Sequence, residues 1–380
     1  MKKYIILAAI IFTLIFCADG FAYQSPIVRV AVIKDANKLE LSIKSEFNIV
    51  PIEVDQLLYS DKFLKSSVVI PTKYGLKIAD MDFKLYGVRI MPLTDSAIFI
   101  NGRSFRGEVD IIRQKNQTLL VVNHINVEDY LRGVLYHEVS HWWPSAVLEA
   151  QAIAARTFAL YQVKMNKGKD YDLETNAFSQ VYGGATSEKF RTNEAVYKTL
   201  GRILVYKNAI LPAYYHATCA GHTEDASILW KTDLTPLKGV VCGFCKISPH
   251  FYWKKIMPVS DIENALSIKN IQAIVSKEWD NSGRIVTLSI KTQDGQTDYT
   301  AKDFRQKLGG NVIKSTIFKI EIKPDKKNNL IAYFEGAGWG HGVGMCQWGA
   351  LGMALHGWTA EKILTYYYPG ADIETYSDRF

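Results

Sequence analysis

The first third of the chain alternates apolar and polar residues with the period of β-strands. Short runs of this kind are separated by turn-forming residues, such as Lys115-Asn116. The runs predict strands at Val28–Val32, Lys38–Ile43, Phe83–Ile90, Phe105–Ile112 and Leu119–Val122. We therefore expect a β-rich region over residues 23–125.

At Asn126 the pattern changes to the period of an α-helix. Asn126 can cap a helix, and Asp129 follows three residues later, ahead of an apolar stripe that continues to Val134. Pro144 then suits the first turn of a second helix, which the apolar spacing extends to about Met165.

The rest of the chain mixes helices and strands, so the expected fold class is α+β. A core over residues 126–258 is followed by a small inserted α+β unit over 259–325, and residues 326–380 complete the core. The patterns predict strands at Gly201–Tyr206 and Leu211–His216, helices at Asp261–Leu266, Lys302–Leu308, Met345–Leu355 and Thr359–Tyr367, and a turn at Asn281–Gly283. Because motifs lie on both sides of the inserted unit, we expect His341 and Gln347 to fold back near Glu138.

Residues 1–22 have the organisation of a secretory signal peptide. Two lysines precede an apolar run from Tyr4 to Cys17, and Gly20-Phe21-Ala22 gives a cleavage pattern of small residues. We expect cleavage after Ala22 and export to the periplasm or to the cell-wall or extracellular space. A lipid anchor on Cys17 is the alternative, which the bulky Phe16 before it disfavours.

The composition is that of an ordinary folded protein, with 380 residues, 48% hydrophobic and 22% charged. The formal charge is +7, and loss of two lysines and one aspartate with the signal peptide leaves +6. This modest excess suits an anionic wall polymer or a membrane surface. It is too small to indicate nucleic acid as a partner.

Glu138 is the first candidate for catalysis. It continues the stripe that passes through Val134, so a helix that reaches it would turn its carboxyl group inward. Partial loss of water would raise the carboxyl pKa, as a general acid requires near neutral pH. If the helix ends sooner, Glu138 is a surface or loop residue.

Several other residues could line a sugar-binding groove. Gln151 interrupts the apolar face of the second helix, Arg156 lies on another side of it, and a later loop carries Gln180 and Tyr182. A satisfied hydrogen bond in the core is the alternative for such a buried amide.

Glycine occupies every second position from Gly336 to Gly344, which allows close approach of backbone or ligand. The lysine and the serine or threonine of a phosphate loop are missing from this run, so a nucleotide site is a poor explanation. Trp339, Trp348 and the tyrosines Tyr366–Tyr368 suit stacking on sugar rings, although buried aromatic side chains of the core are the alternative.

The cysteines suggest a metal site. Cys219 and His222 are spaced C-x2-H, and Cys242 and Cys245 are spaced C-x2-C, which together give four ligands for a tetrahedral, structural zinc ion. His216 and His250 are substitute ligands. A disulfide that joins Cys242 to Cys245 or to Cys219 is the alternative in an exported protein.

Ordered motifs across the chain resemble those of the stage II sporulation protein D family. The resemblance extends from about Gly102 to Ile373. The matching stretches are Val127–Val134, Glu138, Glu149–Thr157, Ser179–Gly184, Tyr215–Glu224, Gly338–Ala350 and Tyr366–Gly370.

The resemblance implies a lytic transglycosylase that cuts peptidoglycan glycan strands between N-acetylmuramic acid and N-acetylglucosamine, typically after the stem peptides have been removed. It implies that Glu138 is the catalytic acid and base, and that a cell-wall amidase supplies the stripped strands. Many relatives have serine where Cys346 stands. The residues expected to bind substrate are Gln151, Arg156, Gln180, Tyr182, His216, Trp339, His341 and Gln347.

Two other functions stay open. The family includes an amidase enhancer, which would bind wall substrate and stimulate another enzyme, so that Glu138 would be dispensable. A zinc hydrolase would instead place His216 or His341 near a metal-activated water. Four protein ligands would leave that zinc no open position.

Overall fold

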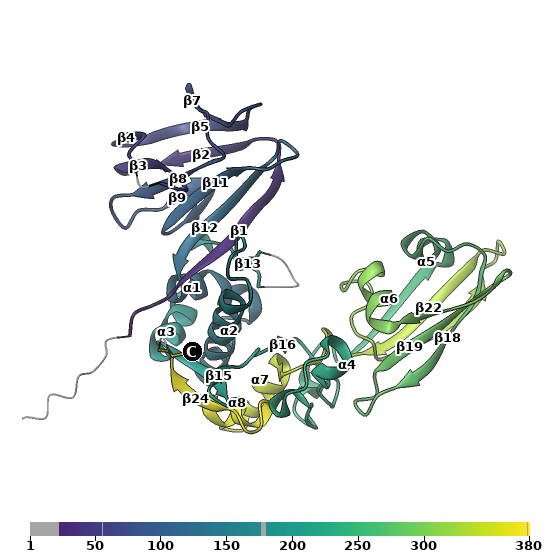
Figure 1. Cartoon of the computed structure of the whole chain (residues 1–380). Coiled ribbons are helices and arrows are strands. Elements are labelled where there is room, and N and C mark those ends of the chain that lie inside the picture. The colour runs from purple at the N-terminus through teal and green to yellow at the C-terminus, as the bar shows by residue number, and fades with distance from the viewer. Residues whose placement is uncertain (1–22, 55, 176–179, 378) are drawn as a thin grey trace, which may run out of the picture.

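The computed structural model describes residues 23–54, 56–175, 180–377 and 379–380 (Figure 1). Helices and strands are mixed throughout this part of the chain, which confirms the α+β fold class. The signal peptide expected over residues 1–22, with Cys17, lies outside the described residues. Within them, no helix has the length and apolarity needed to cross a membrane.

Two largely antiparallel sheets form the N-terminal region. One has seven strands in the order β13-β1-β12-β11-β8-β3-β4, and the other has six in the order β10-β9-β2-β5-β6-β7. The strands are β1 (Ile27–Ala36), β2 (Leu39–Ile43), β3 (Phe47–Pro51), β4 (Tyr59–Asp61), β5 (Leu64–Pro71), β6 (Leu76–Ile78), β7 (Met81–Phe83), β8 (Gly87–Pro92), β9 (Ile98–Ile100), β10 (Arg103–Phe105), β11 (Glu108–Arg113), β12 (Leu119–Asn126) and β13 (Leu173–Glu174).

A shared apolar core explains why these segments form strands. Every second residue of β2 is buried, beginning with Leu39, and its buried side chains join those of β1 and β12 in one cluster. The same cluster includes Tyr130 and Val134 of the first helix, so the sheets and the helical core share their interior. The predicted β-rich region therefore continues directly into the helical part.

Three helices follow the sheets: α1 (Val127–Glu138), α2 (Ser145–Met165) and α3 (Phe190–Lys198). The Asn126 side chain caps α1 by accepting a hydrogen bond of 2.9 Å from the Asp129 amide, as the sequence predicted. Pro144 was predicted in the first turn of the second helix, and it lies one residue earlier, as the N-cap of α2. A short 3-10 turn, η1 (Ala185–Ser187), precedes α3.

A buried ion pair holds α2 against α1. Arg156 is 0% exposed, and its Nε and Nη2 atoms donate to the Glu128 carboxylate at 2.8 and 2.7 Å. Tyr23 also donates to Glu128, at 2.7 Å. Breaking one partner of such a pair typically costs about 3–5 kcal/mol. Arg156, expected in the groove, thus has its guanidinium committed inside the fold.

The C-terminal end of the chain returns to the helical core (Figure 1). β24 pairs with β14, and β23 runs parallel to β16. This part contains β14 (Arg202–Tyr206), β15 (Ala209–Ile210), β16 (Tyr215–His216), α4 (Ala226–Trp230), η2 (Thr235–Leu237), η3 (Cys245–Ile247), β23 (Met345–Cys346), α7 (Gln347–Leu355), α8 (Ala360–Tyr367) and β24 (Asp372–Thr375). The strand predicted over Leu211–His216 is limited to its last two residues.

The inserted unit has its own core and is broader than the sequence predicted. Its strands β17 and β22 pair along their whole length, although the prediction assigned them to the core and to the C-terminal segment. Figure 1 shows the unit to one side of the helical core. Its elements are β17 (Tyr252–Pro258), α5 (Val259–Leu266), β18 (Ile271–Trp279), β19 (Ile285–Thr292), β20 (Gly295–Thr300), α6 (Ala301–Leu308), β21 (Phe318–Pro324) and β22 (Leu330–Ala337).

Candidate active site and cysteine cluster

Glu138 is the last residue of α1. The helix ends there because Val139 has an extended backbone, with φ −138° and ψ 150°. The helix thus reaches the glutamate, and the alternative of an earlier end does not hold. Its side chain is half-buried.

Three segments distant in sequence converge on the Glu138 carboxyl group. The Val181 amide donates to Oε1 at 3.4 Å, and the side chains of Tyr215 and Gln347 also form hydrogen bonds with the carboxyl group. Burial raises its pKa from the ordinary 4.5 to about 7, and these hydrogen bonds act in the opposite direction. Near neutral pH the group can therefore both give and accept a proton.

Gln180 positions the Tyr215 hydroxyl group. The Gln180 amide nitrogen donates to the Tyr215 oxygen at 2.9 Å and to the Ala155 carbonyl at 3.2 Å, while its own oxygen accepts from Tyr130 at 2.9 Å. Because the Tyr215 oxygen accepts from Gln180, its proton is available to Glu138. Tyr215 lies within one of the family motifs but was not among the predicted site residues. Its position directly before His216 in that motif was the only signal.

Gln151 contacts the site indirectly, through a hydrogen bond with the Gln347 side chain. The Gln347 amide nitrogen donates to the Gln151 oxygen at 3.3 Å, and the two side chains are 6% and 0% exposed. The Gln151 amide nitrogen has no hydrogen-bond partner among the described residues. Of the two, Gln347 contacts Glu138 and Gln151 supports Gln347 from inside the core.

Tyr182 lies inside the core and away from any groove surface. Its hydroxyl group donates to the Asn123 side chain at 3.0 Å, and its ring packs on Tyr130 with centroids 5.1 Å apart. At 1% exposure it holds the loop after β13 against α1. The sequence could not show this because the partner, Asn123, belongs to β12.

The two histidines of the expected site pack against each other beside Tyr215, with ring centroids 5.6 Å apart. His216 is 4% exposed and its Nδ1 atom lies 3.1 Å from the Val343 carbonyl, while His341 Nδ1 accepts from the Val343 amide at 3.1 Å. Burial lowers the pKa of His341 to about 3 and that of His216 well below its ordinary value. Both rings are therefore neutral near pH 7.

The glycine-rich run fits tightly against the strand that carries His216. Gly340 has φ +114°, and a Cβ atom there would lie 2.7 Å from the His216 Cβ. Trp339 exchanges backbone hydrogen bonds with Thr218, but its ring packs on His250, with centroids 4.4 Å apart. The run thus serves close backbone packing, and the Trp339 ring faces the inserted unit.

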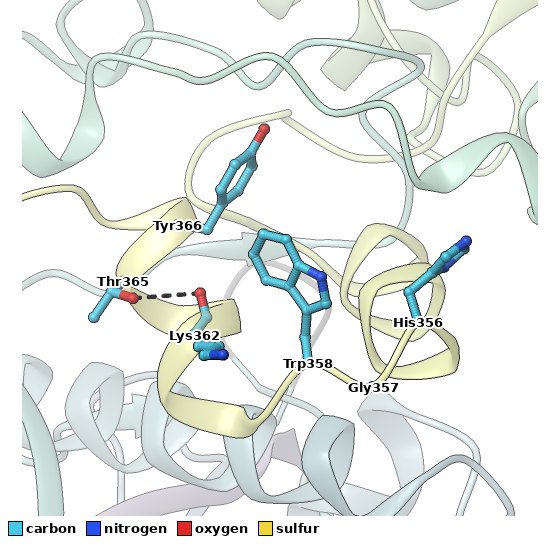
Figure 2. Close-up of a pocket in the computed structure, with 6 residues that line it drawn as sticks. All are labelled: His356, Gly357, Trp358, Lys362, Thr365 and Tyr366. Atoms are coloured by element: carbon cyan, nitrogen blue, oxygen red, sulfur yellow. Dashed lines mark hydrogen bonds between the residues drawn. The ribbon is translucent and has the colours of Figure 1, made fainter.

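A concavity of about 610 Å³ lies at the connection between α7 and α8 (Figure 2). The Tyr366 hydroxyl group donates to the Val241 carbonyl at 2.6 Å, and Trp358 packs on Phe244, so the segment around Cys242 supports it. None of the substrate-binding residues expected from the sequence lines it. Its lining residues are His356, Gly357, Trp358, Lys362, Thr365 and Tyr366.

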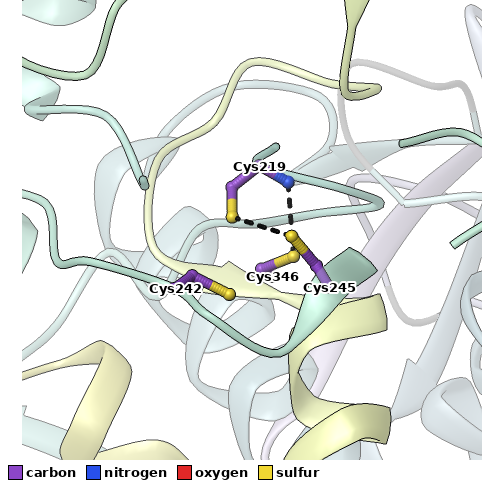
Figure 3. A group of neighbouring side chains, drawn as sticks. All are labelled: Cys219, Cys242, Cys245 and Cys346. Carbon is purple, nitrogen blue, oxygen red and sulfur yellow. Dashed lines mark hydrogen bonds between the residues drawn. The ribbon is translucent and has the colours of Figure 1, made fainter. Parts of the chain in front are cut away.

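Four buried cysteines converge next to this concavity (Figure 3). The Sγ atoms of Cys219, Cys242, Cys245 and Cys346 all lie within 4.8 Å of one another. All four are free, and the Cys219 and Cys245 sulfurs are 3.6 Å apart, beyond the length of a disulfide bond. The sequence prediction had three of the four residues correctly grouped.

Cys346 takes the place in this cluster that the sequence prediction gave to His222. The His222 Nδ1 atom lies 2.6 Å from the Thr223 carbonyl oxygen, and the residue is absent from the group of converging ligand atoms. Cys346 comes from the start of α7, where it accepts hydrogen bonds of 3.3 Å from the Cys219 and Gly349 amides. Sequence spacing missed it because 100 residues separate Cys346 from Cys245, its nearest partner in the chain.

Comparison with known proteins shows which family the chain belongs to. A family model described as Stage II sporulation protein matches residues 115–206, and a model of a domain of unknown function matches residues 248–344. The stage II sporulation protein D of Bacillus subtilis is 31% identical, over 70% of this chain and 78% of that protein. An uncharacterized protein of Brachyspira hyodysenteriae is 33% identical over 94% of this chain and 95% of its own length. The amidase enhancer of Bacillus subtilis is 26% identical, over 80% of this chain and 50% of that protein.

The raised pKa of Glu138 predicts a dependence of stability on pH. Between pH 4.5 and about 7 the folded state holds a proton that the unfolded state has released, so stability falls as pH rises through this window. Glu138→Gln removes this titration. We expect the wild type to lose about 1–3 kcal/mol more than the variant from pH 4.5 to 8, measured by urea denaturation. Parallel stability profiles for the two proteins would contradict the burial of this carboxyl group.

Proposed function

Because the chain belongs to the stage II sporulation protein D family, whose members act at the cell wall, we propose that it is a lytic transglycosylase of peptidoglycan glycan strands. The observation that carries this proposal is the half-buried Glu138 carboxyl group, whose pKa is about 7. Among the described residues, no second carboxylate contributes to its pKa. A hydrolase would ordinarily use such a second carboxylate to activate water or to attack the sugar.

A single carboxyl group is sufficient for the proposed reaction. Protonated Glu138 gives its proton to the glycosidic oxygen, and the bond from that oxygen to the anomeric carbon of muramic acid breaks. The resulting carboxylate then takes the proton of the muramic acid 6-hydroxyl group, whose oxygen bonds to the anomeric carbon. The products are a 1,6-anhydromuramoyl end and a free N-acetylglucosamine hydroxyl group. Tyr215 and Gln347 hold the carboxyl group in place during both steps.

The amidase enhancer supports a second candidate function. Its similarity to this chain is compatible with a protein that binds wall substrate and stimulates a separate amidase. In that case the Glu138 carboxyl group would be dispensable. A catalytic zinc is less well supported, because neither His216 nor His341 belongs to the cysteine cluster.

We expect Glu138→Gln to lower glycan cleavage by about two to four orders of magnitude, because an amide cannot exchange the proton. Stripped glycan strands and strands that carry stem peptides are both incubated with the protein, and the products are read by mass. Glu194→Gln on α3 is the matched control, since within the described part of the chain this glutamate forms an ion pair only with the exposed Lys198. Undiminished turnover of Glu138→Gln would exclude Glu138 as the acid and base and favour the enhancer function.

We further propose that the four clustered cysteines bind one structural zinc ion. Four thiolates satisfy tetrahedral zinc completely and leave no position for substrate. The geometry suits thiolates, since Cys346 accepts two backbone N–H groups and the Tyr367 hydroxyl group lies 3.1 Å from the Cys242 sulfur. A bound zinc ion would supply folding free energy by joining three chain segments.

Metal analysis distinguishes this zinc site from the one that includes His222. We expect about one equivalent of zinc in protein purified without added metal, and a marked loss in Cys346→Ser. His222→Asn should retain the metal. Chelation should lower the melting temperature and reduce activity indirectly. Less than half an equivalent of zinc, together with a disulfide at Cys242 by thiol counting, would contradict the proposal.

A further inference from the structure

Three cations of the inserted unit lie along the glycine-rich run of the core. We define the cationic seam as Arg284, Arg305 and Lys314, which belong to the start of β19, to α6 and to the loop after α6. A Cβ atom at Gly342 would lie 2.5 Å from Arg284 Cζ, so this guanidinium group packs directly on the glycine backbone. The Lys314 ammonium lies 5.0 Å from the centre of the Trp339 ring. The seam therefore follows the boundary between the inserted unit and the core.

Backbone groups hold Arg305 close to His341. Its Nε atom donates to the Ile313 carbonyl at 3.0 Å and to the Lys314 carbonyl at 3.2 Å. The Lys314 carbonyl also accepts from the Gly340 amide, at 2.9 Å. One carbonyl group thus separates Arg305 from the residue before His341, and after burial the charge of Arg305 is the largest cause that lowers the pKa of His341 to about 3.

The free end of Arg305 has no anionic partner. Its two terminal nitrogens form no hydrogen bond within the described part of the chain, and the side chain forms no ion pair there. Burial and the charge of Arg284 lower its pKa to about 10, so the group stays charged at neutral pH. The side chain is half-buried, and such a charge is ordinarily paired because its removal from water costs free energy. Arg305 therefore presents N–H donors that are held in position and unused.

The carboxyl groups of Glu224 and Asp280 offset only part of the charge of the seam. Glu224 Oε2 lies 3.9 Å from Arg284 Nε, an atom without a hydrogen-bond partner among the described residues. Burial, together with the neighbouring Asp280, raises the pKa of Glu224 to about 8, so most of this group is protonated at pH 7. Asp280 accepts from the Ser282 and Arg284 amides of its own turn. The seam thus keeps an excess of positive charge.

An oxyanion is the ligand that suits this arrangement. A planar guanidinium group presents parallel N–H donors that match two oxygens of a carboxylate or of a phosphate. Arg284 and Lys314 add positive potential, which attracts an anion to the same place. Muramic acid that has lost its stem peptide carries such a carboxylate on its lactyl group. A free small anion such as phosphate offers the same chemistry.

We propose that the cationic seam binds one oxyanion group, a carboxylate or a phosphate, between the inserted unit and the core. The Arg305 guanidinium group donates to it, and Arg284 and Lys314 are supporting charges. Its two sources are the lactyl carboxylate of a stripped glycan strand and a free small anion. The first source rests on the proposed action on glycan strands, whereas the anion site itself does not. The inserted unit thereby gains a function in ligand recognition.

Titration with inorganic phosphate and with acetate tests the seam directly. In the full chain labelled with nitrogen-15 arginine, the Arg305 side-chain N–H signal is identified by its loss in Arg305→Lys and followed by NMR at constant ionic strength. We expect a saturable shift, with a Kd about threefold to tenfold higher in Lys314→Gln. Arg202→Gln is the matched control, because this arginine pairs with Glu361 outside the seam, and it should leave Kd unchanged. An Arg305 signal that neither anion shifts would overturn the proposal and leave Arg305 only to fix the loop after α6.

Competition in the Glu138→Gln background distinguishes the two sources. We expect stripped strands to displace phosphate, and strands whose carboxyl groups have been converted to amides to leave it bound. Displacement by neither preparation would assign the site to a free anion. Equal displacement by both would overturn recognition of the oxyanion, since the strand would then bind without it. Phosphate binding by a protein that cleaves no glycan would contradict the proposed transglycosylase while leaving the seam in place.

Discussion

The loss of water around the Glu138 carboxyl group is the constraint on which the rest of the site depends. It requires the end of α1, the loop at Val181, Tyr215 and Gln347 to meet at one point. Tyr215 and Gln347 each have a second partner in the core, which is Gln180 for Tyr215 and Gln151 for Gln347. The site is thus an outcome of tertiary packing, because no single segment could shift the carboxyl pKa alone.

The chain can bring Gln347 to this point only by returning from the inserted unit. Parallel pairing of β16 with β23 secures the return, and the glycine-rich run before β23 fits where side chains would collide. Arg284, from the inserted unit, donates to the carbonyls of Cys219 and His222 at 3.0 Å. The cysteine cluster also brings Cys219, which follows β16, together with Cys346 of β23. Several independent contacts therefore fix the geometry of the core around the insertion.

The sequence predicted those elements that depend on residues close together in the chain. The cap at Asn126, both long helices, most strands and the inward turn of Glu138 follow from periodicity and capping chemistry. Contacts between residues far apart in the chain could not be predicted from periodicity or capping. Arg156 was expected in a groove but pairs with Glu128 in the core, and Cys346 joins the cluster although its neighbours in sequence gave no ligand spacing. Tyr215 gained its place at Glu138 from Gln180, a contact that no period of helix or strand encodes.

The central claim is that one carboxyl group performs both proton transfers, so that the sugar closes on itself and water takes no part. Digestion of stripped glycan strands in water enriched in oxygen-18 tests this claim most directly, with the new reducing-side ends analysed by mass. The account predicts anhydromuramoyl ends that contain no oxygen from the solvent. Muramic acid ends that carry the heavy isotope would show hydrolysis, and would contradict it.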